Sequence, residues 1–381
     1  MSLVEQWRNG VHRELDAAVE LRHRLHASPD LSGREEATAA VVVEALGRGP
    51  GRVVASTGRL VPVVDGGEQP VVLRTELDAL PINERSGAPW ASGNGSMHAC
   101  GHDVHMAALV AVCRAAVALD LPAPLVALLQ PREEGVDSGA MDVVEEGGVQ
   151  GVDAVVAAHV QPQLAPGVVA VTPGPVNASI DEFVVTVRGQ GGHSGYPHTV
   201  TDSVLALSNI VVALQQLGAR RVDPVVGIAC MVNQLRAGTA NNVVPDVAKG
   251  SGTVRTMRDD DRQRAQTAIR DIAHHIALAH GCTADVDIIP GEPPLVNDSH
   301  LATRAHVLLE EMDHPVTADF RSFGSDDFAT YGAHARTLMA FVGTGDAAGG
   351  LHDATFLPDD SYVALVADAL VAGYCAAVAA G

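Results

Sequence analysis

Continuous apolar runs that alternate with helical segments constrain the fold of this chain more than any other feature. The runs at 71–78, 125–129 and 154–158 are rich in Val, Leu and Ala, and helical patterns at 104–119 and 141–146 separate them. A strand that is apolar on both faces is typical of a parallel sheet, because the connecting helices cover both faces. The sequence therefore predicts an α/β fold with a mainly parallel β-sheet flanked by helices, preceded by amphipathic helices at 4–27 and 34–46.

The pattern changes near Asp181. From there the expected order is strand, helix, strand, strand, helix, strand, with elements at 184–188, 202–217, 225–232, 247–257, 259–280 and 283–289. This order is typical of a ferredoxin-like α+β domain. Elements of the first kind resume near Leu301 and include a strand at 338–342 and a helix at 360–379. We therefore predict a discontinuous domain made of 1–180 and 297–381, with a second domain inserted at 181–296, as the length of 381 residues favours.

Composition excludes several classes of partner. The formal net charge of −21 argues against nucleic acid and against an anionic membrane surface, because both require a basic face. No stretch is apolar for long enough to span a bilayer, and the first residues are too charged for a signal peptide. The five cysteines are scattered and odd in number, which does not resemble a disulfide framework and fits a reducing compartment. We expect a cytoplasmic protein.

The segment 97–103 reads Met-His-Ala-Cys-Gly-His-Asp and carries the first chemical signal. If this segment is extended, Cys100 and His102 point to the same side, because side chains alternate along a strand. Sulfur and imidazole nitrogen are ligands that borderline-soft divalent metals accept. A single Cys-x-His pair is a weak signal, and further ligands are needed to support it.

Further ligand types follow the ends of the predicted strands. Glu76 and Asp78 end the first run, the pair Glu133 and Glu134 follows the second, and His159 follows the third. In open α/β sheets, ligands bind at the carboxyl ends of the strands, so these side chains are expected to converge. Taken singly, each has a simpler explanation, since an isolated histidine is usually structural and an acidic pair is usually a solvated loop.

Together, these residues suffice for a two-metal centre. Two N/S ligands, one carboxylate and two more histidines, His159 and His352, can hold two ions that polarise a carbonyl and generate hydroxide. A centre that activates water also needs a nearby base that does not bind metal. Glu133 and Glu134 can supply one ligand and one base, and their spacing alone does not say which is which.

Ten stretches, in order along almost the whole chain, resemble the metallopeptidase M20 family, and more narrowly its aminoacylase, hippuricase and auxin-conjugate amidohydrolase branch. They are Leu21–Leu31, Leu73–Ile82, Met97–His105, Gln130–Glu134, Ala158–Val160, Gly189–His198, Asn242–Asp246, Gly252–Thr256, Ser325–Phe328 and Leu351–His352. The resemblance implies a catalytic α/β domain and an inserted ferredoxin-like lid through which two copies form a homodimer.

The same resemblance implies roles for single residues. The metal ligands are then Cys100, His102, Glu134, His159 and His352. Glu133 resembles the general base, and Asp78 resembles the residue that supports the metal-site histidine. In the lid, His193 resembles the residue that stabilises the tetrahedral oxyanion, and Asn242 and Arg255 resemble the groups that hold the substrate carboxylate. Each of these three is otherwise a plain surface residue of the lid.

Three positions depart from the family pattern. Glu76 and Asp326 stand where Asp and Glu are usual, and Arg132 replaces a small residue. Arg132 either influences the neighbouring base, or binds an anionic substrate group, or faces solvent as an ordinary loop arginine. The residues with the implied catalytic roles are intact.

The sequence therefore predicts a dinuclear metal-dependent amidohydrolase that acts on N-acyl amino acids, of the aminoacylase or hippurate hydrolase type. Zn or Mn are the expected metals, and Co or Ni suit the same ligands. A carboxypeptidase or dipeptidase of the same family is the near alternative, and a non-catalytic amino-acid-binding protein is a remote one. The run Gly343–Ala348 fits a dinucleotide fingerprint, but no βαβ unit follows it.

Overall fold

The computed structural model describes residues 1–67, 69–135 and 137–379. The chain divides into two compact units. The first comprises Met1–Gly174, Val296–Phe320 and Thr330–Gly381, and the second comprises Pro175–Leu295 and Arg321–Ala329. Across the described residues, no helix has the length and apolar character needed to cross a membrane.

An eight-stranded sheet is the centre of the first unit, with the strand order β1-β2-β4-β3-β5-β16-β6-β15. The strands are β1 (Arg52–Val54), β2 (Gly58–Val64), β3 (Val71–Glu76), β4 (Leu125–Gln130), β5 (Ala154–Gln161), β6 (Val169–Ala170), β15 (Val316–Thr317) and β16 (Arg336–Gly343). Strands β4, β3, β5 and β16 run parallel to their neighbours within this group, while β2 and β6 flank the group antiparallel to it. The predicted α/β fold with a mainly parallel sheet is confirmed.

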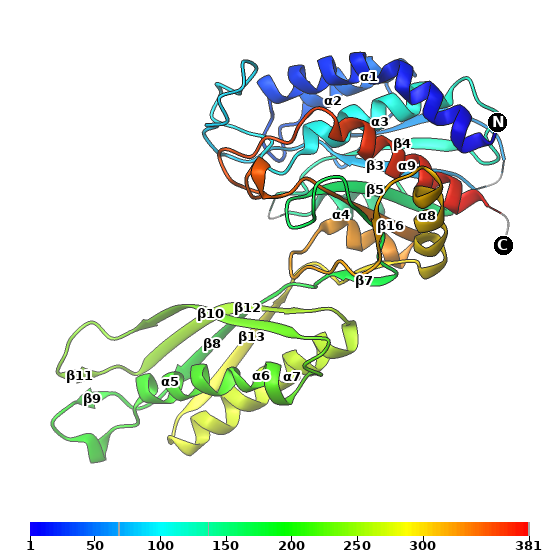
Figure 1. The fold of residues 1–381 in the computed structure, drawn as a ribbon. Coiled ribbons are helices and arrows are strands. Elements are labelled where there is room, and N and C mark those ends of the chain that lie inside the picture. The colour runs from blue at the N-terminus through cyan, green and yellow to red at the C-terminus, as the bar shows by residue number, and fades with distance from the viewer. Residues whose placement is uncertain (68, 136, 380–381) are drawn as a thin grey trace. The chain divides into compact units, whose positions relative to one another are not determined.

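Helices cover this sheet. They are α1 (Leu3–Ala27), α2 (Glu36–Leu46), α3 (His102–Ala116), α4 (Gly139–Glu145), α8 (Ser299–Glu311) and α9 (Tyr362–Val378). Both α3 and α9 contact the sheet, and α1 contacts both of these helices (Figure 1). Helix α3 is buried on nearly all sides, as its apolar sequence predicts. A Cβ at Gly10 of α1 would lie 2.9 Å from Cβ of Ala115, so the close approach of α1 to α3 requires glycine.

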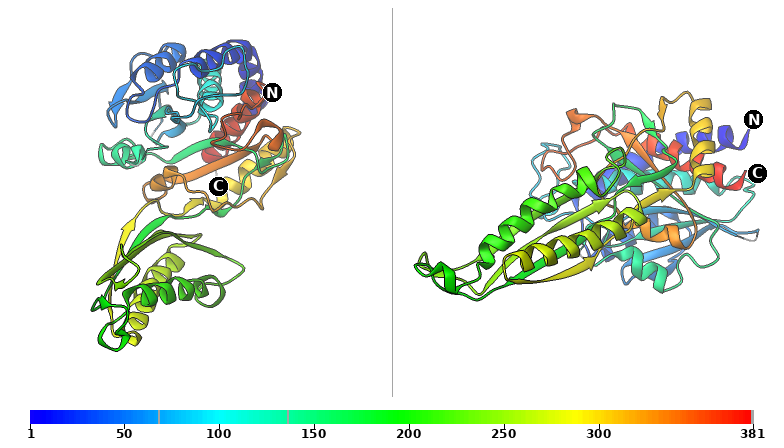
Figure 2. Two further views of the ribbon diagram at one scale, coloured as in Figure 1. Left: turned by 90° about the vertical axis from the view of Figure 1, so that its left-hand side faces the viewer. Right: turned by 90° about the horizontal axis from the view of Figure 1, so that it is seen from below.

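The second unit contains a four-stranded antiparallel sheet with the order β10-β12-β8-β13. Its strands are β8 (Asp181–Arg188), β10 (Ile228–Ala237), β12 (Val247–Thr256) and β13 (Thr283–Pro290), and its helices are α5 (Ser203–Leu214), α6 (Gln216–Arg220) and α7 (Asp259–Ala279). Helices α5 and α7 lie side by side on one face of the sheet, where they bury Phe183, Val185, Ile210 and Ile269 (Figure 2). The segment predicted as one helix at 202–217 is two helices, α5 and α6, that meet at Gln215.

Short elements complete the chain. They are β7 (Gly174–Asn177), β9 (Gly192–His193), β11 (Val243–Val244), β14 (Leu295–Asn297) and the 3₁₀ helices η1 (Pro197–Thr199), η2 (Asp327–Ala333) and η3 (Asp346–Ala348). The chain first passes from the first unit to the second at β7 and returns at β14, and these two strands pair. It joins the second unit again at Arg321–Ala329. The strands β9 and β11 form a separate ribbon in the second unit.

Candidate metal centre

A tight turn brings the Cys100 segment to the start of α3. Residues 99 and 100 lie in the turn, and His102 is the first residue of the helix. The segment is therefore not extended, which was the condition under which we expected Cys100 and His102 to point to the same side. Gly101 caps the helix with φ +82°, and a Cβ at that position would lie 2.4 Å from Val160 of β5. Only glycine allows this left-handed turn against the neighbouring strand. The turn therefore places both side chains beside the carboxyl end of β5.

The predicted metal ligands gather at this point in the first unit. One ligand atom from each of Cys100, His102 and Glu134 lies within 4.8 Å of the others. His159 Nε2 is 3.4 Å from Cys100 Sγ, and His352 Nε2 is 3.2 Å from Glu134 Oε1. The loop that carries His352 is tied to the Cys100 turn, because the backbone N–H of His352 donates to the Ala99 carbonyl at 2.8 Å.

Two of the histidines are held in the same tautomer. His102 Nδ1 lies 2.8 Å from the backbone oxygen of Asp78, and His159 Nδ1 lies 2.6 Å from that of Val160. A carbonyl oxygen only accepts, so the hydrogen of each ring is on Nδ1. Each ring therefore presents the lone pair of Nε2, which is how proteins usually orient a histidine that binds metal.

Hydrogen-bond accounting tests whether these residues fit a metal ion. His102 Nε2 is buried and has no hydrogen-bond partner among the described residues, although nearly all buried polar atoms in proteins have one. The thiol of Cys100 and the carboxylate of Glu134 lie close to it, and sulfur, nitrogen and oxygen together form a donor set that borderline divalent metals accept. The residues therefore fit a divalent cation.

The electrostatics of Cys100 and His159 agree with this reading. Burial, and then the negative charges of Glu134 and Glu133, raise the pKa of the Cys100 thiol well above its ordinary value, as expected where a cation is needed to form the thiolate. Burial lowers the pKa of His159 to about 3, so its imidazole is neutral and able to coordinate. A hydrogen bond with Glu134 raises the pKa of His352.

Glu133 and Asp78 border the cluster. Glu133 Oε2 is 3.7 Å from His102 Nε2, and the Glu133 side chain is 11% exposed. Asp78 contacts His102 through its backbone carbonyl, whereas its carboxylate Oδ1 is 3.8 Å from His102 Nδ1. The other carboxylate oxygen, Oδ2, accepts from the backbone N–H of Glu134 at 2.9 Å. Asp78 thus orients both His102 and Glu134.

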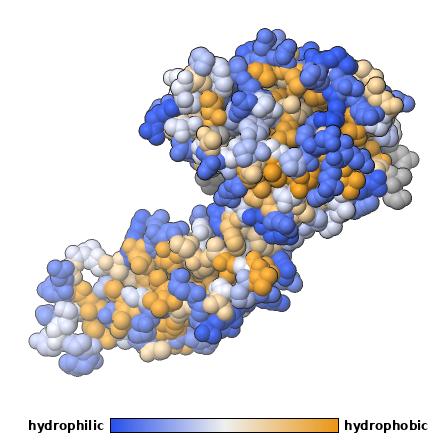
Figure 3. Space-filling view, in the orientation of Figure 1, coloured by the Kyte–Doolittle hydropathy of each residue, from blue (hydrophilic) through white to orange (hydrophobic). Residues whose placement is uncertain are grey.

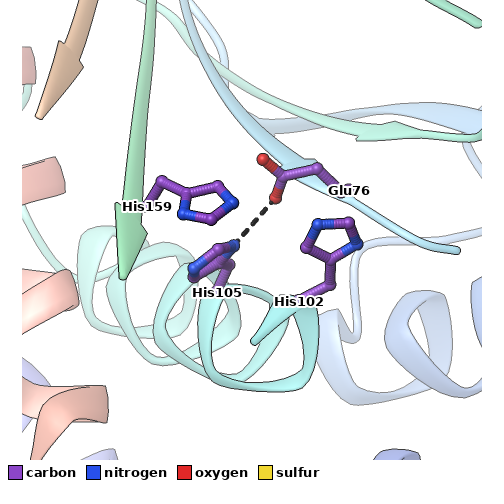
Figure 4. A group of neighbouring side chains, drawn as sticks. All are labelled: Glu76, His102, His105 and His159. Carbon is purple, nitrogen blue, oxygen red and sulfur yellow. Dashed lines mark hydrogen bonds and ion pairs between the residues drawn. The ribbon is translucent and has the colours of Figure 1, made fainter. Parts of the chain in front are cut away.

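A second group of ligand-type side chains adjoins the first and shares His102 with it. This group was not predicted from the sequence, because His105 was not among the candidate residues. Glu76, His102, His105 and His159 are all buried with ligand atoms within 4.8 Å of one another (Figure 4). His105 lies one helical turn after His102 on α3, and this spacing was the available signal. The ring of His105 points at the Glu76 carboxylate (Figure 4).

Both nitrogens of His105 are already used. Nδ1 donates to Glu76 Oε2 at 3.0 Å, and Nε2 accepts from the backbone N–H of Val160 at 3.0 Å. Arg74 pairs with the other oxygen of Glu76. Burial alone would raise the pKa of Glu76, but Arg74 and His105 hold it well below the ordinary value. His105 therefore anchors the backbone next to His159 and has no lone pair left for a metal.

The three residues predicted for the lid lie in the second unit. His193 is exposed on β9 and pairs with Val243 of β11, and the adjacent Asn242 accepts through its carbonyl from the N–H of Ser194 at 3.1 Å. Arg255 is half-buried on β12, where its Nη1 donates to the carbonyl of Phe323 at 2.7 Å and burial lowers its pKa.

Two of the departures from the family pattern have visible partners. Arg132 forms an ion pair with Asp142 and is 19% exposed, so its guanidinium already has an anionic partner within the chain. Asp326 is buried and accepts from the N–H of Phe328 at 2.8 Å, which fixes the start of η2.

Comparison with known proteins gives consistent similarities. Residues 72–370 match the model of Peptidase family M20/M25/M40. N-acetyl-L-cysteine deacetylase of Bacillus subtilis is 34% identical over 86% of this chain and 80% of that protein. Thermostable carboxypeptidase 2 of Saccharolobus solfataricus is 32% identical over 98% of each chain. A B. subtilis crystal structure described as a dinuclear metal binding peptidase from the M20 family has a TM-score of 0.84 and 27% identity, and covers 96% of this chain and 98% of its own.

Proposed function

Because this chain belongs to peptidase family M20/M25/M40, we propose that it is a metal-dependent amidohydrolase that cleaves N-acyl amino acids into a carboxylate and a free amino acid. The observation that carries the proposal is the meeting of the Cys100, His102 and Glu134 donor atoms beside Glu133, with His102 Nε2 buried and without a hydrogen bond among the described residues. The relative named N-acetyl-L-cysteine deacetylase supports the substrate class, since N-acetylcysteine is an N-acyl amino acid.

Two divalent metal ions are part of this proposal. The residues that would hold them are Cys100, His102, Glu134, His159 and His352. When bound, such ions polarise the amide carbonyl and lower the pKa of a water molecule. The mixed sulfur, nitrogen and oxygen donors favour Zn or Mn, and Co or Ni suit them as well.

The remaining chemistry falls to side chains of this chain. Glu133 takes a proton from the attacking water and delivers it to the leaving nitrogen, the role of a general base that becomes a general acid. In the second unit, we assign stabilisation of the oxyanion to His193. Asn242 and Arg255 hold the substrate carboxylate, for which the planar guanidinium of arginine offers two parallel hydrogen bonds.

The test removes the base and keeps the metals. Glu133→Gln and Glu133→Ala should lower turnover by about 10²–10⁴-fold while the metal content stays that of the wild type, because the substitution leaves the ligands in place. Turnover is measured as amine release, and metal content by elemental analysis. Asp137→Asn, at an exposed acidic residue of the same loop, is the matched control. Near-complete activity of Glu133→Ala would contradict the assigned mechanism.

The same assay separates the second candidate function. The carboxypeptidase relative aligns with nearly the whole chain, and this favours a peptidase as the alternative. N-acetyl, N-benzoyl and dipeptide substrates should be compared by kcat/KM with the wild-type enzyme. Higher kcat/KM for N-acyl amino acids supports the amidohydrolase, whereas preference for dipeptides would favour the peptidase.

We also propose that the segment 181–296 acts as a lid and mediates a homodimer. Apolar surface is visible over the second unit (Figure 3), where the large hydrophobic side chains at least half exposed include Leu205, Val212, Met231 and Leu235. Such patches usually mark interaction sites. Light scattering should give twice the chain mass of 39.4 kDa. Leu235→Asp should favour the monomer, while Val307→Asp on α8 of the first unit should not.

A further inference from the structure

A buried glutamate on the N-terminal segment reaches the loop that carries Glu133. Glu35 is 0% exposed, and its Oε1 accepts from the backbone N–H of Gly33 at 2.8 Å and from that of Arg132 at 2.9 Å. Its Oε2 accepts from the hydroxyl of Thr57 at 2.8 Å. Thus one of the three bonds crosses to a loop almost one hundred residues away. In the part of the chain that the structure describes, all three donors are neutral.

Local helix capping does not explain this carboxylate. Glu35 directly precedes α2, but its side chain makes no capping hydrogen bond. Asp30 makes the hydrogen bonds to the start of the helix instead, since its Oδ2 accepts from both the N–H and the hydroxyl of Thr38 at 2.8 Å. The Glu35 carboxylate is therefore directed at the loop of residues 132–134 and not at its own helix.

Two buried carboxylates hold alternate amides of that loop. Glu35 binds the N–H of Arg132, and Asp78 binds the N–H of Glu134. Glu133 lies between these two fixed positions. Asp78 itself accepts a hydrogen bond from the Ser32 hydroxyl at 2.6 Å. The segment 32–35 therefore supplies one of the two carboxylates, Glu35, and contacts the other, Asp78. The backbone on each side of Glu133 is thereby fixed from the same neighbouring segment.

The loop needs this restraint. Arg132 has φ +57°, a left-handed conformation that is strained for a residue with a Cβ and persists only where its surroundings impose it. Without the bond to Glu35, the Arg132 N–H is no longer held and its φ should rotate to negative values, although its carbonyl still accepts from the N–H of Gly139 at 3.2 Å. That rotation would redirect Glu133, which follows in the chain, while Glu134 would still be held by Asp78.

We propose that Glu35 is a positioning residue for the hydrolytic reaction. Its carboxylate fixes the Arg132 amide, and through it the direction of the Glu133 side chain, without contact with substrate or metal. This inference rests on the proposed role of Glu133 as general base. It predicts a defect in kcat with little change in KM or metal content, because the ligands and the substrate contacts lie elsewhere.

The experiment compares three substitutions in the full-length, metal-loaded enzyme. Glu35→Ala should lower kcat by about 10²-fold, the usual effect of a displacement near 1 Å at a catalytic group, with KM changed less than about threefold and metal content unchanged. Glu35→Gln keeps an oxygen for the Arg132 amide and should recover most of kcat. Thr57→Val removes the third hydrogen bond only, so it controls for loss of a buried contact and should keep kcat near the wild-type value.

Amide hydrogen exchange gives a readout that does not depend on activity. In metal-free protein, Glu35→Ala should remove protection of the Arg132 amide and leave that of the Glu134 amide. If Glu35→Ala does not fold, Glu35→Asp replaces it, because its shorter side chain does not reach both amides, and it should show the same losses relative to Glu35→Gln.

Wild-type kcat in Glu35→Ala or Glu35→Asp would overturn the inference, and so would equal kcat losses in Glu35→Gln and Glu35→Ala. A fall in kcat that merely follows lost metal would also overturn it, since Glu35 would then support a ligand and not the base. If the wild type hydrolyses no N-acyl amino acid, the proposed function fails, and the exchange measurement still decides whether Glu35 fixes the Arg132 amide.

Discussion

Two groups of side chains of metal-ligand type lie side by side in the first unit and differ in their hydrogen bonds. In the Cys100 cluster (Cys100, His102 and Glu134), His102 Nε2 is buried without a hydrogen-bond partner among the described residues. In the His105 cluster (His105 and Glu76), the imidazole nitrogens are bonded to Glu76 and to the Val160 amide, and Arg74 pairs with the carboxylate. By composition alone, both groups qualify as metal sites.

The difference shows how to read such clusters. Leaving a buried polar atom without a partner costs about 1–3 kcal/mol, so atoms that stay unpaired indicate a missing partner, and a cation is what these donors suit. Ligand-type atoms that already have hydrogen-bond partners indicate residues that hold the surrounding structure in place and do not bind metal. We therefore assign metal binding to the Cys100 cluster and anchoring of β5 to the His105 cluster.

The largest expected effect comes from removing a ligand of the Cys100 cluster. His102→Ala should lose bound metal and reduce turnover to the background of the assay, because a ligand is removed. Saturating metal should also stabilise this variant less than it stabilises the wild type, which gains about 4 kcal/mol at a free metal concentration 1,000-fold above Kd. Elemental analysis and denaturant unfolding with and without metal measure both. A variant with full metal content would show that His102 is not a ligand.

The same substitution at His105 should cost more stability and less metal affinity than His102→Ala does. His105→Ala strands the Glu76 carboxylate and the Val160 amide, so the metal-free protein should lose about 1–3 kcal/mol more stability than His102→Ala does. Metal affinity should fall only about 10–100-fold, as is usual when a residue that supports a ligand is removed. Competition with a chelator measures the affinity. Complete loss of metal in His105→Ala, with stability unchanged, would reverse our assignment of the two clusters.

Sequence reasoning succeeded where the pattern depends on neighbours along the chain. The apolar runs that predict β3, β4 and β5 are correct within a few residues, because burial on both faces leaves a continuous signal. Glu134 follows β4 as expected, whereas His159 lies within β5, which continues two residues further to Gln161, and not after it. The gathering of Cys100, His102, Glu134 and His159 near these strand ends could still be expected before any coordinates.

Sequence reasoning failed where the role of a residue depends on backbone that is distant from it along the chain. The role of His105 depends on the Val160 amide, 55 residues away, and no periodicity encodes that contact. The turn at Cys100 depends on the left-handed φ of Gly101 against β5, which an alternating strand pattern does not anticipate. Likewise β10 begins at Ile228, after Gly227 with φ +80°, and not at Val225.

The smallest expected effect concerns the pH dependence of the His105 cluster. Arg74 and His105 hold the pKa of Glu76 well below its ordinary value in the folded protein, although burial opposes this. A depressed pKa adds stability above the unfolded value of about 4.3, and this stability is lost as the pH falls toward the folded value. The unfolding free energy of the metal-free wild type should therefore decrease below about pH 4.3, by up to about 1.4 kcal/mol per pH unit, relative to Glu76→Gln. Urea unfolding from pH 7 to pH 3 measures this, with Glu20→Gln on α1 as the same substitution at an exposed site. A difference between wild type and Glu76→Gln that stays constant over this range would mean that Glu76 is not held as an anion by Arg74 and His105.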